Sequence, residues 1–268
     1  MSTTVSSNMP SRRNVVRSAA WTVPVVAAST AVPAYAASCG STTHPYTLTW
    51  RTVTYATTTT GAGSTLTKTG TATIPGPAGS SPVVATFTST QVGIDSRTAG
   101  NLTVQANNYP NVGATGGTGL LLQHQGIVAG RNASRQVVRI QFDRPVTGLR
   151  FTITDIDAHN AAGSNQSADF YDRVELTGNR TFTATPRGGG NVYVIGTGVA
   201  GSENNAGEGP WRMYNNSTVA SDNGDSAGNV AVTYAGAVQD ITLTYWNARG
   251  TGNQAIFLSG FTFDALGC

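Results

Sequence analysis

The chain has 268 residues, of which 39% are hydrophobic and 11% charged, with 16 basic and 13 acidic side chains. Arg12, Arg13 and Arg17 stand near the N-terminus in a stretch without acids, and removing them leaves 13 basic against 13 acidic residues. The remaining chain is neutral by formal count. Charge therefore provides no argument for a nucleic-acid or anionic-surface partner, and we expect no nucleic-acid binding.

Residues 1–36 have the pattern of an export signal. A polar start leads to Arg12-Arg13 and a weakly apolar run, which ends at 34–36 in A-Y-A, the small-x-small pattern that signal peptidases cleave. The apolar run is too short to remain as a membrane helix. The paired arginines predict a twin-arginine signal peptide at 1–36, and a general secretory signal is the alternative.

The two cysteines, Cys39 and Cys268, stand almost at the two ends of the exported part, 37–268. Export to an oxidising compartment favours a disulfide between them. In the chain-entropy model, closing so long a loop would stabilise the fold by about 4–5 kcal/mol. A lipid on Cys39 or two free thiols are the alternatives. Because no apolar C-terminal helix or sorting motif follows the domain, we expect no transmembrane anchor.

Residues 37–268 are predicted to form a single all-β domain. Thr, Val, Ile, Tyr and Phe recur at alternate positions between turns of Gly, Pro, Asn and Ser, which is typical of short strands. We expect an antiparallel two-sheet sandwich, jelly-roll-like, with a closed barrel as the alternative. The strands are expected near 46–50, 53–55, 65–74, 83–89, 101–106, 119–124, 136–142, 148–156, 172–177, 180–185, 191–196, 229–234, 239–246 and 255–264.

The apolar alternation changes phase near Arg51-Thr52, which predicts a bulge or a bend where the chain passes between sheets. Three Gly-, Thr- or Pro-rich stretches are predicted as loops, at 57–64, 75–82 and 196–228. Loops as long as the third are uncommon unless they are functional or disordered.

Four aspartates flank the predicted loop 158–168. Side chains two apart share one face of a strand, so Asp155 and Asp157 continue the buried stripe that precedes them, and Asp172 begins the buried stripe of the next strand. If the two strands pair as a hairpin, these three carboxylates converge at one rim of the sandwich. Asp169 would lie close by.

Converging carboxylates repel one another unless a cation neutralises them. Ca²⁺ takes six to eight oxygen ligands from carboxylates and carbonyls, which this segment supplies. The predicted metal ligands are Asp155, Asp157, Asp169 and Asp172. The alternative is that these aspartates end the strands, accept hydrogen bonds from loop N–H groups and pair with Arg150 or Arg173.

The long loop carries the candidate ligand-binding residues Trp211, Tyr214, Glu203 and Glu208. Aromatic rings beside carboxylates predict a carbohydrate-binding surface, and the alternative is that the rings cover the edges of the sandwich. Two carboxylates could also cleave a glycosidic bond. No G-x-S-x-G motif and no metal-binding histidine spacing supports another hydrolytic mechanism.

Three segments of the sequence resemble a group of exported proteins. These are the leader S-R-R-N-V-V-R-S-A-A-W-T-V-P-V-V, the blocks F-T-I-T-D-I-D and D-R-V-E-L, and the closing strands from G-N-V-A-V-T-Y to Q-A-I-F-L-S-G-F-T-F. They are similar to twin-arginine-exported secreted β-sandwich surface proteins of high-GC Gram-positive bacteria, whose biochemical role is largely unassigned. The resemblance implies export and a sandwich fold, and it transfers no catalytic residue.

These features predict a secreted or cell-envelope-associated binding module. We expect it to be calcium-stabilised and to bind a cell-wall or extracellular polysaccharide through its rim loops. A structural or adhesive surface protein without a discrete ligand site is the alternative, and a polysaccharide-acting enzyme is the second alternative.

Overall fold

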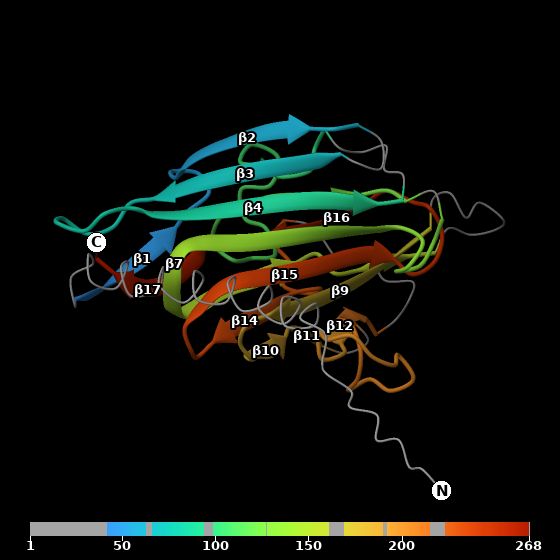
Figure 1. The fold of residues 1–268 in the computed structure, drawn as a ribbon. Helices are drawn as coiled ribbons and strands as arrows, with labels where there is room; N and C mark the ends of the chain where they lie inside the picture. Colours follow the sequence, from blue (N-terminus) through green and yellow to red (C-terminus); the bar gives the residue numbers. More distant parts are fainter. Residues whose placement is uncertain are drawn as a thin grey trace, which may run out of the picture. The chain divides into compact units, whose positions relative to one another are not determined.

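Strand β7 (Arg135–Thr154) organises the fold because it belongs to both layers of a β-sandwich. The structure is a computed structural model that describes residues 42–62, 66–93, 99–126, 128–160, 169–189, 192–214 and 223–267. The first half of β7 pairs with two strands of the front layer in Figure 1, and the second half pairs with strands of the layer behind. The all-β antiparallel prediction is confirmed.

The first layer is an antiparallel sheet that runs across the front of Figure 1. It contains, in spatial order, β2 (Thr54–Thr60), β3 (Thr67–Ile74), β4 (Val83–Val92), the first half of β7, β15 (Val238–Asn247), β9 (Phe170–Gly178) and β8 (Ala158–His159).

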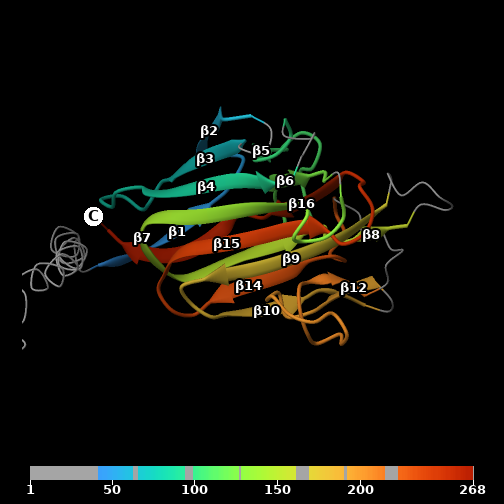
Figure 2. The same cartoon turned by 45° about the vertical axis from the view of Figure 1, so that its right-hand side comes forward.

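The second layer continues from the other half of β7. It contains β10 (Phe182–Pro186), β14 (Val230–Tyr234), β17 (Phe261–Leu266), β1 (Thr43–Leu48), β16 (Gln254–Leu258), β6 (Leu120–His124) and β5 (Thr103–Val104). A separate three-stranded sheet contains β11 (Gly188–Gly189), β12 (Val192–Ile195) and β13 (Arg212–Met213). Figure 2 shows β12 beside the end of β10. A jelly roll has eight strands, whereas 14 strands within the described residues join one hydrogen-bonded sheet, so this sandwich is larger than a simple jelly roll.

A bulge at Gly148 carries β7 from one layer to the other. Before it, the even-numbered residues as far as Val146 are buried, and after it the odd-numbered residues from Leu149 are buried. Gly148 has a φ of 60°, in the left-handed region that favours glycine. The extra residue reverses the faces of the strand, so that each half turns its apolar side chains toward the same core.

Replacing Gly148 by alanine is expected to lower the free energy of unfolding by about 1–2 kcal/mol, the cost of the left-handed conformation for a residue with a Cβ. The added Cβ would meet only Asp264 Oδ2, at 3.7 Å, so the loss would come from the backbone. Gly117→Ala is the control, because a Cβ there meets nothing within 4 Å and the φ is ordinary. Urea unfolding of both variants measures the difference, and equal stabilities would contradict the account.

The predicted change of sheet near Arg51-Thr52 is confirmed. Strand β1 pairs with β17 in the second layer, whereas β2 pairs with β3 in the first. The connecting turn is closed by the N–H groups of Thr52 and Val53, which both donate to the carbonyl of Thr49. The phase change in the sequence therefore marks the corner between the layers.

Several predicted strand boundaries were wrong. The stretch at 57–60 was predicted as loop, but it completes strand β2, whose threonines pair with β3. The predicted strands at 136–142 and 148–156 form the single strand β7. The predicted strand at 255–264 is divided at Ser259-Gly260 into β16 and β17.

Aromatic side chains join the two layers across the core. Phe87 of β4 contacts Phe261 of β17, with ring centroids 6.0 Å apart, and Phe142 of β7 contacts Phe263 of β17 at 5.3 Å. Trp50 contacts Phe87 at 5.3 Å. Residues Thr43–Gly267 group into one compact unit. The signal peptide at 1–36 and the Cys39–Cys268 disulfide lie outside the described residues, so both stay predictions.

Candidate functional site

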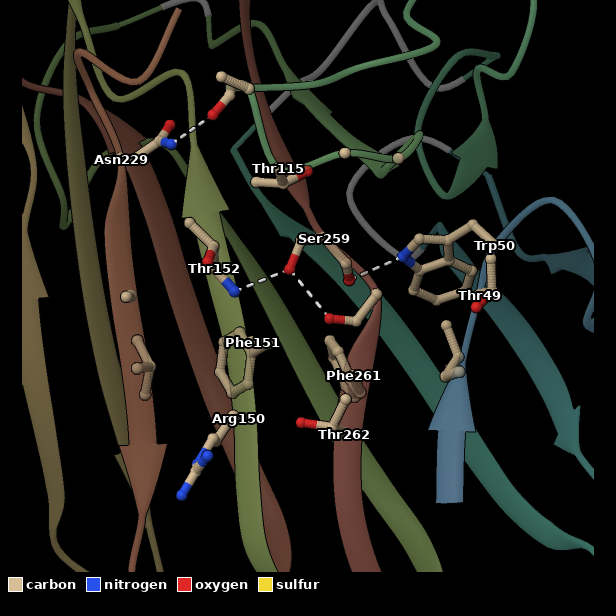
Figure 3. A pocket seen from close by; sticks show the side chains of 18 of the residues that line it. Thr49, Trp50, Thr115, Arg150, Phe151, Thr152, Asn229, Ser259, Phe261 and Thr262 are labelled. Carbon is tan, nitrogen blue, oxygen red and sulfur yellow. Dashed lines mark hydrogen bonds between the residues drawn. The ribbon is translucent and has the colours of Figure 1, made fainter. Parts of the chain in front are cut away.

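A groove of about 650 Å³ lies on the outer face of the second layer. Its floor is formed by residues of β14, β7, β17 and β1, and a loop at 113–118 stands over one end, as Figure 3 shows. The position follows from strand alternation, because the inward residues of these strands fill the core and the outward ones remain for the surface.

Hydroxyl groups dominate the groove. On the outward faces of the strands stand Thr47 of β1, Thr152 of β7, Thr233 of β14 and Thr262 of β17. Further hydroxyls in the lining come from Thr49, Thr115, Thr118, Ser226 and Ser259. Each serine or threonine hydroxyl can donate one hydrogen bond and accept others, so the groove can pair with both donors and acceptors of a ligand.

Ser259 completes the floor where β16 ends and β17 begins. Its N–H donates to the carbonyl of Thr152 at 2.9 Å, and its Oγ accepts from the Thr152 N–H at 2.8 Å. The same Oγ donates to the carbonyl of Gly260 at 2.9 Å, as Figure 3 shows. Through these two hydrogen bonds Ser259 continues the pairing with β7 between the end of β16 and the start of β17. The floor of the groove therefore has no gap there.

The loop at 113–118 is held in a fixed conformation beside the floor. The side chain of Asn229 donates to the carbonyl of Gly113 at 2.7 Å, and Asn111 Oδ1 accepts from the Gly116 N–H at 2.7 Å. Gly113 has a φ of 52°, and a Cβ there would lie 2.4 Å from Asn229 Oδ1. Glycine is therefore required where the loop approaches the start of β14.

Polar groups in this region are incompletely satisfied. The Asn229 Oδ1 and Thr118 Oγ1 atoms are buried in the lining, and neither has a hydrogen-bond partner among the described residues. Most buried polar atoms in folded proteins are paired, so unpaired ones are unusual features of this end of the groove.

Sequence reasoning missed this groove. Its outward threonines follow the same alternation as any solvent-facing strand, so they carry no distinct signal. The one local indication was the segment N-V-G-A-T-G-G-T-G at 111–119, whose glycines predict an irregular, closely packed loop.

The predicted aspartate cluster lies at one end of the sandwich interior. Asp155, Asp157, Asp169 and Asp172 are at most 6% exposed. Strands β7 and β9 do not pair as the predicted hairpin, because β15 lies between them. Asp157 and Asp172 nevertheless meet, because the Asp157 N–H donates to Asp172 Oδ2, and the charges of Asp172, Asp157 and Asp155 all raise the pKa of Tyr245.

Asp172 is the centre of this buried group. Its Oδ1 accepts hydrogen bonds from Tyr245 Oη at 3.0 Å and from Gln254 Nε2 at 2.6 Å, and its Oδ2 accepts from the Asp157 N–H at 3.1 Å. Burial raises the pKa of the Asp172 carboxyl to about 7, while the three donors act in the opposite direction. Burial and the Asp172 charge together raise the pKa of Tyr245.

The four aspartates do not form a recognisable metal cluster in the described part of the chain. No group of three or more His, Cys, Asp or Glu side chains there is placed to hold a metal ion. Asp169 instead accepts through its backbone carbonyl from the Gly252 N–H and from Asn247 Nδ2. Residues 161–168 of the intervening loop lie outside the described residues, and calcium binding stays a prediction.

Trp211 and Tyr214, predicted as ligand contacts, occupy different environments. Trp211 is 0% exposed and its ring packs against Phe182 with centroids 5.6 Å apart, so it belongs to the core and has no free face for a sugar. Tyr214 is 48% exposed and stacks on Tyr193 at a centroid distance of 4.7 Å. Neither residue lines the groove.

Of the other predicted ligand residues, Glu203 is engaged with β9 and Glu208 is engaged within the long loop. The Glu203 carboxylate pairs with Arg173 at 2.7 Å, and Glu208 Oε1 accepts from Asn205 Nδ2 at 3.1 Å. Arg212 is buried and donates to the backbone carbonyls of residues 203, 205, 208 and 210. These contacts shape the loop, and they place both glutamates away from the groove.

Comparisons with known proteins add little. No protein-family model and no curated protein matches the sequence. The chain aligns with a solved structure, the N-terminal domain of an adhesin from Streptococcus gordonii, with 12% identity and a TM-score of 0.33. The alignment covers 82% of this chain and 61% of that one, which is too weak a likeness to carry an argument. None of the described segments forms a helix with the length and hydrophobicity that a membrane crossing requires.

Proposed function

We propose that this protein is a secreted or cell-envelope-associated binding module whose ligand site is the hydroxyl-lined groove over β14, β7, β17 and β1. The observation that carries the proposal is the groove itself, about 650 Å³ and lined mainly by serine, threonine and glycine. Pockets that bind ligands are concave surfaces with a few convergent polar groups on a rigid scaffold. The twin-arginine leader predicted at 1–36 supports export to the cell surface or the medium.

The chemistry of the lining favours a polysaccharide. Hydroxyl groups on four neighbouring strands present donors and acceptors to the open groove, and those of Thr47, Thr262 and Thr233 lie in one row across the strands. A chain of hydroxylated sugar rings offers a matching series of donors and acceptors. An open groove, unlike a closed cavity, accepts an internal segment of a long polymer.

The groove is expected to lose its ligand when its centre is filled. Ala231 lies on the outward face of β14 directly opposite Thr152 of β7, so Ala231→Trp would place an indole over the floor. We expect binding to purified cell-wall polysaccharide, measured by calorimetry, to weaken at least about tenfold. Strands accept aromatic residues at exposed positions, so the variant should fold.

The matched control is Thr177→Trp, at an exposed position of β9 in the first layer. It adds the same indole away from the groove and should bind like the wild type. If both variants bind equally well, the groove is not the site. If the wild type binds no cell-wall or extracellular polysaccharide in such assays, the proposed function is wrong.

A further inference from the structure

Among the described residues, the lining of the groove carries two positive charges and no negative one. Arg150 of β7 and Arg187, which follows β10, are the ionisable residues of this described lining, and both are exposed. Neither guanidinium forms an ion pair with an acid among the described residues. Asp225 precedes the lining residue Ser226, and Asp264 of β17 lies two residues after Thr262, but neither aspartate belongs to the lining.

The two arginines stand apart along β14. Arg150 is paired in register with Thr233, while the Arg187 N–H donates to the carbonyl of Asn229 at 2.8 Å. Four residues of strand separate these levels, which corresponds to about 13 Å at about 3.3 Å per residue. Arg150 lies on β7 and Arg187 follows β10, and these two strands pair with opposite sides of β14. Two cationic positions therefore lie at different points along the groove.

None of the lining residues that the structure describes offers an aromatic face on which a neutral sugar could stack. The aromatic residues there are Trp50, Phe151 and Phe261, and each is at most 4% exposed because its ring belongs to the core. The lining thus leaves hydrogen bonds and charge as the sources of affinity. The guanidinium fork binds carboxylate or phosphate oxygens through two parallel hydrogen bonds, which gives it geometric selectivity as well as charge.

We infer that the ligand of this groove is an acidic polysaccharide, whose repeated carboxylate or phosphate groups meet Arg150 and Arg187 while its hydroxyls meet the threonines of the same floor. This inference rests on the proposed function and specifies its ligand. A neutral glycan would leave both guanidinium groups in water, whereas an acidic one gains two charge-assisted contacts.

The test compares three soluble probes of similar length with the wild-type protein: an oligogalacturonate, a glycerol-phosphate oligomer and a neutral β-glucan. We expect at least one acidic probe to bind about tenfold or more tightly than the neutral one. Its affinity should fall as salt rises, because exposed charges are screened. The two acidic probes distinguish a carboxylated from a phosphate-linked source.

Arg150→Ala and Arg187→Ala should each weaken binding of the acidic probe about fivefold, and the double variant about 25-fold, since well-separated contacts act nearly independently. Arg150→Lys keeps the positive charge but loses the forked guanidinium. Its affinity for the acidic probe should therefore lie between those of the wild type and Arg150→Ala. Arg180→Ala, an exposed arginine outside the groove, is the matched control and should bind normally. Melting temperatures confirm that each variant is folded.

The outcomes separate this inference from the function on which it rests. If all probes bind equally, or if the arginine variants bind the acidic probe like wild type while Ala231→Trp does not, the acidic-ligand inference is wrong and the groove remains a binding site. If no probe binds, or if binding is insensitive to Ala231→Trp as well, both the inference and the proposed function are wrong.

Discussion

Trp211→Ala is expected to lower the free energy of unfolding by about 3–5 kcal/mol, the usual cost of removing a large buried aromatic side chain. The indole is 0% exposed, and a Cβ added at Gly198 would come within 2.3 Å of it, which shows how closely the backbone packs on the ring. The residue also exchanges both backbone hydrogen bonds with Val174 of β9. Denaturant unfolding of the variant measures the loss.

The comparison with Tyr214→Ala separates a core role from a ligand role. Tyr214 is half exposed and loses mainly its stacking on Tyr193, so the expected cost is about 0.5–1.5 kcal/mol. Trp211→Phe should fold well enough for binding assays and should bind polysaccharide like wild type. Lost binding in a stable Trp211→Phe variant would show instead that the tryptophan contacts the ligand.

Asp172 is expected to make the wild type less stable, relative to the Asp172→Asn variant, as pH rises from about 4 to about 7. Burial raises the pKa of the folded-state carboxyl to about 7, above its unfolded value near 3.9. The folded protein therefore binds a proton that the unfolded chain has released. That stabilisation is complete below about pH 4 and is lost as pH rises through the folded pKa, by up to about 4 kcal/mol in total.

The variant is needed because His124 works in the opposite direction. Burial lowers the pKa of His124 to about 4, so its contribution to stability is present above about pH 6.5 and is lost as pH falls toward 4. Subtracting the pH dependence of the unfolding free energy of Asp172→Asn from that of the wild type cancels the contribution of His124, which both proteins contain. Urea unfolding at half-unit pH steps gives both curves, and a difference that does not change with pH would contradict the raised pKa.

Side-chain alternation predicted the class of fold because burial in a sheet has a period of two. The change of phase at Arg51-Thr52 was visible in sequence, and it marks the corner between β1 and β2. The equivalent change at Gly148 was missed, since neither Thr147 nor Gly148 interrupts the hydrogen-bonded strand. The prediction ended one strand at 142 and began another at 148, whereas β7 is continuous and serves both layers.

The aspartate cluster shows how a correct local inference can rest on a wrong pairing. The alternation around Asp155, Asp157 and Asp172 predicted that their side chains turn inward at one end, and all three are buried, with Asp172 accepting a hydrogen bond from Tyr245. Tyr245 follows Asp172 by 73 residues in the chain. Its strand, β15, lies between β7 and β9. Long-range strand order is set by packing of the whole core and cannot be deduced from local patterns.

The groove could not be predicted because its residues come from four strands that are distant in sequence. Thr47, Thr152, Ala231 and Thr262 become neighbours only through the order of β1, β17, β7 and β14. In the sequence each is an ordinary outward residue of a strand. Trp211, by contrast, attracted attention as an aromatic residue in a long loop, and its burial depends on the same long-range order.

The central claim, that ligand binds on the outer face of the second layer, is tested most directly by mapping backbone amide NMR shifts of the isotope-labelled protein as soluble cell-wall polysaccharide fragments are added. We expect the largest changes on Thr152, Ala231 and Thr262 and on the loop at 113–118. Changes confined to Tyr193, Tyr214 and the loop at 203–210 would contradict it and would place the binding surface on the long loop instead.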